Sequence, residues 1–341
     1  MATSTLRFLA GIMVLACASA VAHADSEDPW TFSVYFENDL FADTDQHYTN
    51  GLKLSWTSRD VTRYAEQLPD WLHPSVEKLP RGWRSESDQK QRNVTISLGQ
   101  NIYTPQDIEA ANVVEDDRPY AGWLYLGIGF QQRTRRQLDE LEVQLGVIGP
   151  LALAEQTQTF VHQFRGLRKP RGWDKQLSTE PGIGLFYQRR WRFGQLPLWR
   201  RFGVDAIAHV GGAVGNVSTH AEAGLMTRLG WNLPADFGSS RIRPGGDVSA
   251  PLQSGRKRDF GIHAFFGIDG QAVLHDIFLD GNTFADSHSV DKRHLVGNAA
   301  LGVSVVWSRF KLSAARVFRS REFRQQERSH RFGSITLTVF Y

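Results

Sequence analysis

Acidic, amide and hydroxyl side chains crowd a short stretch between two strand-like segments. They lie between positions 38 and 49 and comprise Asn38, Asp39, Asp43, Asp45, His47 and Thr49. Asn38 and Asp39 end the first segment and Thr49 begins the second, so a hairpin turn would bring these residues side by side. Their oxygen atoms are hard ligands that suit Ca²⁺ better than zinc. The alternative is ordinary turn chemistry, because Asn, Asp and Thr favour turns for backbone reasons.

A second polar cluster lies where one strand-like segment ends and another begins. Pro105 and Pro119 bracket the connecting loop, and Asp117 and Arg118 stand immediately before the second proline. The Arg118 guanidinium either forms a structural ion pair with Asp117 or binds a phosphate or carboxylate group of a substrate. The sequence alone favours the structural pair.

A histidine is the candidate for acid–base chemistry. Gly149 and Pro150 close a strand-like segment, and residues 151–163 have a helical composition and carry His162 near their end. A histidine exchanges protons near neutral pH, which suits a general base. The alternative is a structural histidine whose ring nitrogens are satisfied within the protein, which is the more common situation for a single histidine on a short helix.

A serine nucleophile is not favoured. On a strand, a histidine and a serine two residues apart project to the same side and could form a catalytic pair. The chain offers this spacing in the order His-x-Ser only at His73 and Ser75, in a proline-containing segment where no strand is expected. His288 and Ser289 are adjacent and would point to opposite faces of a strand.

These residues need a scaffold, and the scaffold indicated is a barrel. Apolar and polar residues alternate at a period of two, as Phe32, Val34 and Phe36 do with their neighbours. Runs of this kind occupy residues 31–37, 51–56, 93–99, 121–133, 138–148, 181–193, 201–215, 220–231, 259–273, 293–307, 308–319 and 332–341. Single-chain bacterial outer-membrane barrels have an even number of strands. The sequence predicts an all-β fold: a transmembrane antiparallel barrel of about twelve strands with a short helix after residue 150.

The last strand-like run strengthens this prediction. Ile335, Leu337, Val339 and Tyr341 share one face, and hydroxyl side chains take the other. A terminal strand of this kind that stops on an aromatic residue resembles the end of outer-membrane barrels. The alternative is the edge strand of a soluble sandwich. The 10 Trp, 8 Tyr and 21 Phe residues could form the aromatic girdles of a membrane barrel.

The N-terminal region predicts export. Arg7 provides a positive start, an apolar run follows, and a small-x-small site precedes Asp25, so residues 1–24 are expected to be a cleaved signal peptide and 25–341 the barrel. Cleavage near Ala24-Asp25 would remove Cys17, the single cysteine, which leaves no disulfide or thiolate metal site. Acylation of Cys17 as a lipoprotein is the alternative. We expect integral insertion in a bacterial outer membrane, a monomer, and no binding of nucleic acid.

Several short motifs occur together and in a fixed order. They are Asn38-Asp39, Tyr48-Thr49-x-Gly51, Gln100-x-Ile102-Tyr103-x-Pro105, Asp117-Arg118 and Gly146-Val147-Ile148-Gly149-Pro150 with the later His162. In this order and spacing the chain resembles the outer-membrane lipid A 3′-O-deacylase family. The motifs cover the first half of the mature chain, and the second half matches only as a generic barrel.

The resemblance implies a Ca²⁺-dependent carboxylic ester hydrolase that removes the 3′-linked acyloxyacyl chain from lipid A of lipopolysaccharide. It places Asn38, Asp39, Thr49 and His162 at active-site positions, with the first three near the metal and His162 as the base that activates water. The family also has a lysine in the loop between the equivalents of Pro105 and Arg118.

This sequence departs from the family pattern at that lysine. No Lys occurs in residues 106–117, so the substrate-contact role would pass to Arg118 or Lys53. The departure keeps two alternatives open. One is a different outer-membrane lipid esterase, for example a phospholipase, and the other is a barrel without enzymatic activity.

Overall fold

The computed structural model describes most of the chain after the N-terminal region. The described residues are 30–39, 47–84, 90–168, 170–238 and 260–341. The expected signal peptide with Cys17, and the turn residues Asp43 and Asp45, lie outside these ranges.

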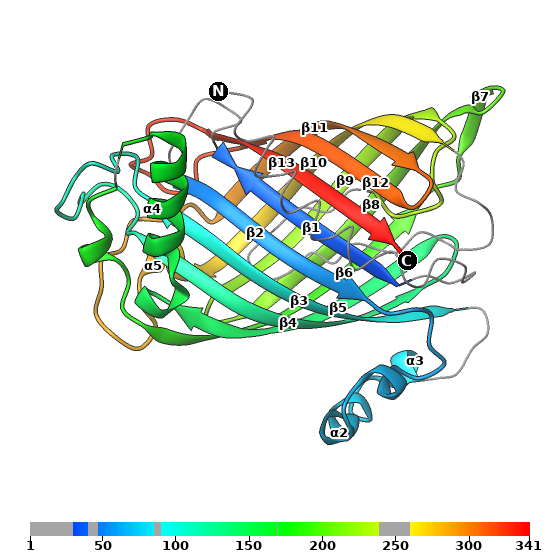
Figure 1. Ribbon diagram of the computed structural model, residues 1–341, viewed down its shortest axis with the longest axis horizontal. Helices are drawn as coiled ribbons and strands as arrows, with labels where there is room; N and C mark the ends of the chain where they lie inside the picture. The colour runs from blue at the N-terminus through cyan, green and yellow to red at the C-terminus, as the bar shows by residue number, and fades with distance from the viewer. Residues whose placement is uncertain (1–29, 40–46, 85–89, 169, 239–259) are drawn as a thin grey trace.

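One antiparallel sheet contains thirteen strands among the described residues (Figure 1). They are β1 (Thr31–Asn38), β2 (His47–Thr57), β3 (Gln91–Thr104), β4 (Ala121–Arg133), β5 (Gln137–Ile148), β6 (Glu180–Arg192), β7 (Leu196–Trp199), β8 (Phe202–Gly215), β9 (Ser218–Trp231), β10 (Gly261–Asp276), β11 (Leu295–Trp307), β12 (Phe310–Arg319) and β13 (His330–Phe340). All but the short β7 correspond to the strands expected from the alternation.

The sheet closes on itself. β1 pairs with β13, with Thr31 opposite Phe340, and β6 pairs with β8 beyond the short β7. Twelve strands therefore form a closed barrel, and β7 adds to β8 as an extra strand at one end. Closure removes the sheet edges whose unpaired backbone groups would be costly in a bilayer. The predicted fold class is confirmed.

Side chains along the strands alternate between the inside and the outside of the barrel. On β6, Ile183 and Leu185 point outward and are exposed, whereas Phe186 and Gln188 are buried in the interior. Hydroxyl groups line the interior at the seam between the first and last strands, where Ser33 and Thr338 are hydrogen-bonded at 2.9 Å. The in–out pattern is thus the one expected of a barrel with an apolar outer surface and a polar interior.

The helices are short. They are η3 (Tyr64–Gln67), η4 (Asp70–Leu72), α2 (His73–Val76), α3 (Arg81–Arg84), η5 (Pro150–Ala152), α4 (Ala154–Arg165), η6 (Trp173–Lys175) and α5 (Ile277–Asp280). α4 is the helix predicted after residue 150. The sequence reading did not predict α5 or the helical turns of 64–84, because single turns have no periodicity long enough to detect. Within the described ranges, no helix is long and apolar enough to cross a membrane.

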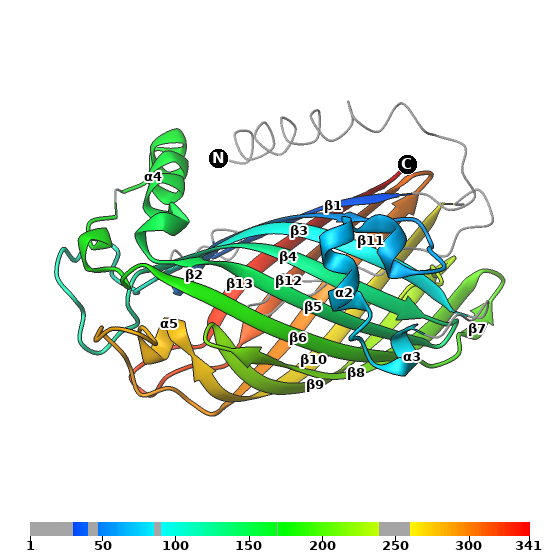
Figure 2. The same ribbon diagram turned by 90° about the horizontal axis from the view of Figure 1, so that it is seen from below.

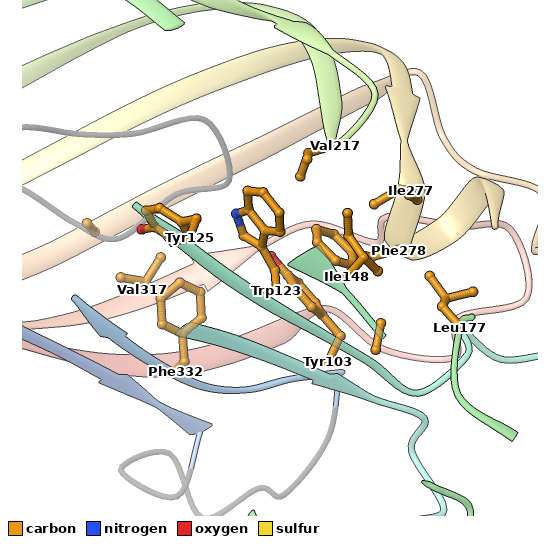
Figure 3. Close-up of a cluster of buried hydrophobic side chains, with 12 residues drawn as sticks. Tyr103, Trp123, Tyr125, Ile148, Leu177, Val217, Ile277, Phe278, Val317 and Phe332 are labelled. Carbon is orange, nitrogen blue, oxygen red and sulfur yellow. The ribbon is translucent and has the colours of Figure 1, made fainter. Parts of the chain in front are cut away.

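An aromatic cluster fills the interior near the end of the barrel where α4 and α5 lie (Figure 3). Phe278 of α5 is fully buried and stacks on Tyr103 of β3, with ring centroids 3.9 Å apart. Trp123 and Tyr125 of β4 stack beside them at 5.4 Å. α5 therefore folds into this mouth of the barrel and is held by ring stacking.

The mouth is also held by a charged group. Asp280 accepts hydrogen bonds from Lys292 at 2.7 Å and from the backbone N–H of Asp276 at 2.9 Å, and it pairs with His275 at 3.0 Å. Burial raises the pKa of Asp280, but the hydrogen bonds from His275 and Lys292 outweigh it and lower the pKa from 3.8 to about 2. A lowered pKa means that the folded mouth prefers the ionised carboxylate.

We expect the anchoring of α5 to depend on acid pH. The contribution of Asp280 is fully present above pH 3.8 and is lost as the pH falls through about 2. The protection of residues 277–292 from hydrogen exchange in detergent, relative to the intrinsic rate at each pH, should therefore fall over this range, and Asp280→Asn should remove most of that dependence. An unchanged pH profile in the variant would contradict the assignment.

Candidate active site

Two of the predicted metal-ligand residues stand at the end of β1. Asn38 pairs with Asn50 of β2 on one side and with Gly333 of β13 on the other. The side chains of Asn38 and Asp39 are both buried, at 3% and 0% exposed. Pairing of β1 with both neighbours therefore fixes the backbone that carries this buried amide and the buried carboxylate next to it at the rim.

Thr49 lies in β2 immediately before Asn50, the residue that pairs with Asn38. The register between β2 and β3 shifts between Tyr48 and Asn50, so Thr49 stands at an irregularity of the strand. Bulges of this kind are common at barrel rims and beside active sites, because they re-aim the chain. The approach of Thr49 to Asn38 and Asp39 stays a prediction, and His47 begins the same strand.

His162 lies on α4, at the same end of the barrel as the start of β2 (Figure 1). Ala154, Gln158 and His162 are spaced four residues apart and are all buried, so they form one inward stripe of the helix. Figure 2 shows α4 on the outer side of the barrel wall. The histidine therefore stands on the inward-facing side of a helix that lies outside the barrel.

The start of α4 is seated on the wall through a glycine. A Cβ atom added to Gly122 of β4 would lie 2.5 Å from the Cβ of Ala154 and 2.9 Å from that of Ala152. Gln100 of β3 donates to the carbonyl of Ala152 at 2.7 Å, and Gly149 donates to the carbonyl of Gly122 at 3.1 Å. The helix approaches the strand this closely only because position 122 has no side chain.

Strand pairing connects Gly122, where the start of α4 contacts the barrel wall, to the end of β1. Asn38 pairs with Asn50, Asn50 with Ile102, and Ile102 with Gly122, so the four residues form one row across β1 to β4. Strands are spaced about 4.8 Å apart, so the row spans roughly 14 Å. His162 is eight residues beyond Ala154, which is about 12 Å along the helix. The row and α4 therefore share one end of the barrel and have similar lengths.

The imidazole of His162 is oriented by a backbone carbonyl. Nδ1 of His162 lies 2.5 Å from the carbonyl oxygen of Arg168. A carbonyl can only accept, so Nδ1 carries the proton, and in the neutral ring Nε2 is the basic atom. Gly166 ends α4 in the left-handed conformation at φ 67°, and Leu167 donates to the carbonyl of His162, which turns the chain back toward the ring.

The loop after α4 contacts Gln158, another buried residue of the inward stripe. Trp173 donates its indole N–H to the side-chain oxygen of Gln158 at 2.9 Å and packs on Tyr120 at 4.8 Å. Tyr120 in turn donates to the carbonyl of Ile108. Sequence reasoning did not identify Gln158, Trp173 or the Arg168 carbonyl, although the spacing of Gln158 and His162 on one helical face was a usable signal.

The two predicted substrate contacts, Arg118 and Lys53, are both buried. Arg118 is 2% exposed and its guanidinium pairs with Glu322 at 2.7 Å, with the ring of Phe323 at 5.5 Å. Lys53 points into the barrel and pairs with Glu142 at 3.3 Å. Both cations are thus parts of buried ion pairs, so the geometry favours a structural role for them.

Asp117 organises the loop that the two prolines bracket. Its carboxylate accepts from the backbone N–H groups of Gln106 and Arg118, at 2.5 and 2.7 Å. His288 donates to the carbonyl of Asp117 at 2.7 Å. The structural alternative for Arg118 is thus supported, but its ion-pair partner is Glu322, which is 204 positions away in the chain and could not be inferred from local sequence.

The donors at the end of β1 have the chemistry that Ca²⁺ requires. Asn38 and Asp39 offer oxygen ligands, which suit a hard cation. Among the residues that the structure describes, no group of three or more His, Cys, Asp or Glu side chains could hold a metal ion. The pair therefore fits Ca²⁺ in ligand type, and Asp43 and Asp45 lie outside the described residues.

Large apolar residues are exposed on the outward side of α4, next to the exposed Gln156 and Gln163. Leu153, Phe160 and Phe164 are each at least half exposed, and the rings of Phe160 and Phe164 stack at 6.4 Å. In a soluble protein the apolar side of a surface helix faces the core, whereas here the polar stripe faces inward. Such a helix is suited to a surrounding of hydrocarbon.

Comparison with known proteins identifies the family. The chain matches the family described as outer membrane protein LpxR over residues 8–341. It is a member of the LpxR family. The protein is therefore an integral protein of the outer membrane, as predicted. None of the curated proteins matches this sequence.

A solved structure of an LpxR protein shows the same fold. LpxR from Salmonella typhimurium aligns with a TM-score of 0.71 at 18% identity, covering 91% of this chain and 100% of that chain. The β domain of the Bordetella autotransporter BrkA aligns with a TM-score of 0.43 at 9% identity, covering 93% of this chain and 99% of that chain. The alignment with the Salmonella LpxR structure extends over nearly the whole barrel.

The close contact between Gly122 and the start of α4 leads to a direct structural prediction. Gly122→Ala places a Cβ against Ala154 and must displace the start of α4, so hydrogen exchange in α4 should increase while the barrel stays folded. Gly184→Ala is the matched control, because a Cβ there meets no atom within 4 Å. Equal protection of α4 in both variants would contradict the seating.

Proposed function

We propose that this protein is a Ca²⁺-dependent lipid A 3′-O-deacylase that hydrolyses the ester of the 3′-linked acyloxyacyl chain. Membership of the LpxR family and the resemblance of the motifs around Asn38, Thr49 and His162 support this substrate class. The single observation that carries the reaction type is the orientation of His162, a buried imidazole whose Nδ1 donates to a backbone carbonyl.

His162 acts as the general base. Donation by Nδ1 to the Arg168 carbonyl leaves Nε2 as the atom that accepts a proton from water as the water attacks the ester carbonyl. The same hydrogen bond stabilises the imidazolium that results, because the carbonyl dipole faces the charged ring. The proton then passes from His162 to the leaving alkoxide of the sugar.

Asn38 and Asp39, together with Thr49, would hold the Ca²⁺ ion. When bound, it would supply the positive charge that polarises an ester carbonyl and stabilises an oxyanion. The chain's own part is to present buried oxygen donors at a rigid strand end, where pairing with β2 and β13 fixes their direction. The carboxylate of Asp39 carries the negative charge of this donor set.

The position of α4 suits an ester that lies in a membrane. Its outward side, with Leu153, Phe160 and Phe164, contacts acyl chains of the outer leaflet. Its inward side carries His162 between the helix and the rest of the protein. The scissile ester thus approaches the base from the hydrocarbon side, without leaving the bilayer.

Residues 106–117 contain no lysine, so another cation would contact the phosphorylated sugar. Arg118 and Lys53 are buried in ion pairs, whereas the Arg168 guanidinium is 83% exposed and pairs with Glu109. The backbone carbonyl of Arg168 also orients His162, so residue 168 lies next to the proposed base. Arg168 is the better candidate to bind an anionic group of lipid A.

The lack of the loop lysine also supports a second candidate function, a phospholipase-like lipid esterase. Mass spectrometry of lipid A from expressing cells should show loss of the acyloxyacyl group if the primary proposal is correct. Fatty acid released from phospholipids, with unchanged lipid A, would select the second candidate. Hydrolysis of neither lipid by folded protein would leave a barrel without enzymatic activity.

Removal of the base should abolish the reaction. His162→Ala is expected to lower the deacylation rate by about 10² to 10⁴-fold, because general base catalysis contributes roughly that factor. Gln163→Ala, on the exposed side of the same turn, should keep the wild-type rate. Both variants should show the heat-dependent gel shift of a folded barrel. Full activity in His162→Ala would contradict the assigned base.

Removal of Ca²⁺ should have a matching effect. Chelation of Ca²⁺ is expected to stop deacylation, and added Ca²⁺ should restore it where Zn²⁺ does not, since the donors are hard oxygens. Asp39→Asn should raise the Ca²⁺ concentration needed for half-maximal rate by tenfold or more, on the order of one lost charge-assisted ligand. Asp174→Asn, at an exposed carboxylate, is the control. Activity that persists without Ca²⁺ would refute the metal requirement.

A further inference from the structure

A long connection between β2 and β3 folds back onto the outside of the barrel. It comprises residues 59–84, here called the 59–84 segment, and contains η3, η4, α2 and α3. Figures 1 and 2 show it outside the wall, at the end where the C-terminus lies and away from α4. An even number of strands places both chain ends on one side, which is the periplasmic side in an exported barrel.

The 59–84 segment packs directly against the outer face of the barrel wall. Five of its apolar side chains are buried against the wall: Val61, Tyr64, Leu68, Val76 and Trp83. Tyr64 donates to the carbonyl of Gln131 at 2.8 Å and meets the ring of Phe130 edge-on at 5.3 Å. Val61 donates its backbone N–H to the carbonyl of Arg92 at 2.9 Å. These contacts hold the segment to strands β3 and β4.

The wall residues beneath it belong to the apolar outer surface. Val94, Ile128, Phe130 and Leu141 pack against the segment, from β3, β4 and β5. They continue the outward-facing rows of exposed residues nearer the other end, such as Leu98, Leu126 and Leu145. The 59–84 segment therefore covers part of the same apolar belt that lipid covers elsewhere.

The segment itself presents an aromatic residue away from the wall. Trp71 of η4 is 74% exposed, and Leu72 and Leu79 beside it are only partly buried. Exposed charged residues such as Glu77 and Lys78 lie on the same short helical stretch. A tryptophan set among charges and beside an apolar surface has the composition of the membrane–water boundary, where an indole has apolar and polar surroundings together.

We infer that the 59–84 segment is a membrane-interface element, which binds phospholipid of the periplasmic leaflet through Trp71. It rests on the apolar belt, replaces lipid there, and extends the contact of the protein with the leaflet beyond the barrel wall. The indole of Trp71 lies at the boundary between headgroups and acyl chains. This contact involves no residue of the proposed active site and is at the opposite end of the barrel.

Spin labelling in a lipid bilayer tests this inference directly. In a Cys17→Ser background, which removes the single cysteine, labels are attached at Trp71→Cys, Leu126→Cys and Glu77→Cys. The folded variants are reconstituted in vesicles of phosphatidylethanolamine and phosphatidylglycerol, and collision with O₂ and with a water-soluble nickel chelate is measured. Leu126 is the reference for the hydrocarbon, and Glu77 for the aqueous side.

The label at position 71 should give an O₂-to-nickel accessibility ratio at least threefold above that at position 77 and below that at position 126. A ratio equal to that at position 77 would place Trp71 at the same depth as an exposed charged residue of its own segment and overturn the inference. Protection from both reagents would mean that protein covers the segment, and would overturn it as well.

Fluorescence of the unlabelled protein gives an independent check. Phospholipids brominated near the headgroup end of the acyl chain should quench the wild type, which has 10 tryptophans including Trp71, more than Trp71→Phe. The difference spectrum isolates Trp71. Equal quenching of the two proteins would contradict insertion of the indole, even if the label at position 71 perturbs the segment.

Discussion

Pairing of every strand around the closed barrel is the constraint on which the rest depends. Backbone groups within a bilayer must find partners in the protein, and the β1–β13 and β6–β8 pairs complete the ring. A closed wall leaves its interior to packed side chains, including the Tyr103–Phe278 stack at one mouth. Chemistry on a membrane lipid must then take place at the rim or outside the wall, and there α4 and the end of β1 lie.

The position of α4 follows from small residues and backbone hydrogen bonds. Gly122 lets the helix touch the strand, Gly149 turns the chain at φ 84°, and Gly166 ends the helix and returns the chain to His162. None of these glycines does chemistry. They set the distance of the helix from the wall and the ring orientation of the base, so activity depends on backbone geometry as much as on the reactive side chains.

Much of the fold could be read from the sequence, because alternation at a period of two is a strong signal when repeated twelve times. The helix of His162 was also predictable from composition. The partners of Arg118 and Lys53 were not, since Glu322 and Glu142 are distant in the chain and interior pairing depends on barrel register. β7, α5 and the 59–84 segment are built from short pieces that carry no periodic signal, and their positions follow from packing on the finished barrel.

The proton on the His162 ring is the most direct test of the account. Selective ¹⁵N labelling of the 11 histidines, with His162→Gln to assign the signal, reports which ring nitrogen is protonated in the folded protein in lipid at a pH of about 8, where histidine is neutral. The account predicts a proton on Nδ1 and an unprotonated, basic Nε2. A neutral ring protonated on Nε2 would contradict it, because the atom proposed to accept a proton from water would already carry one.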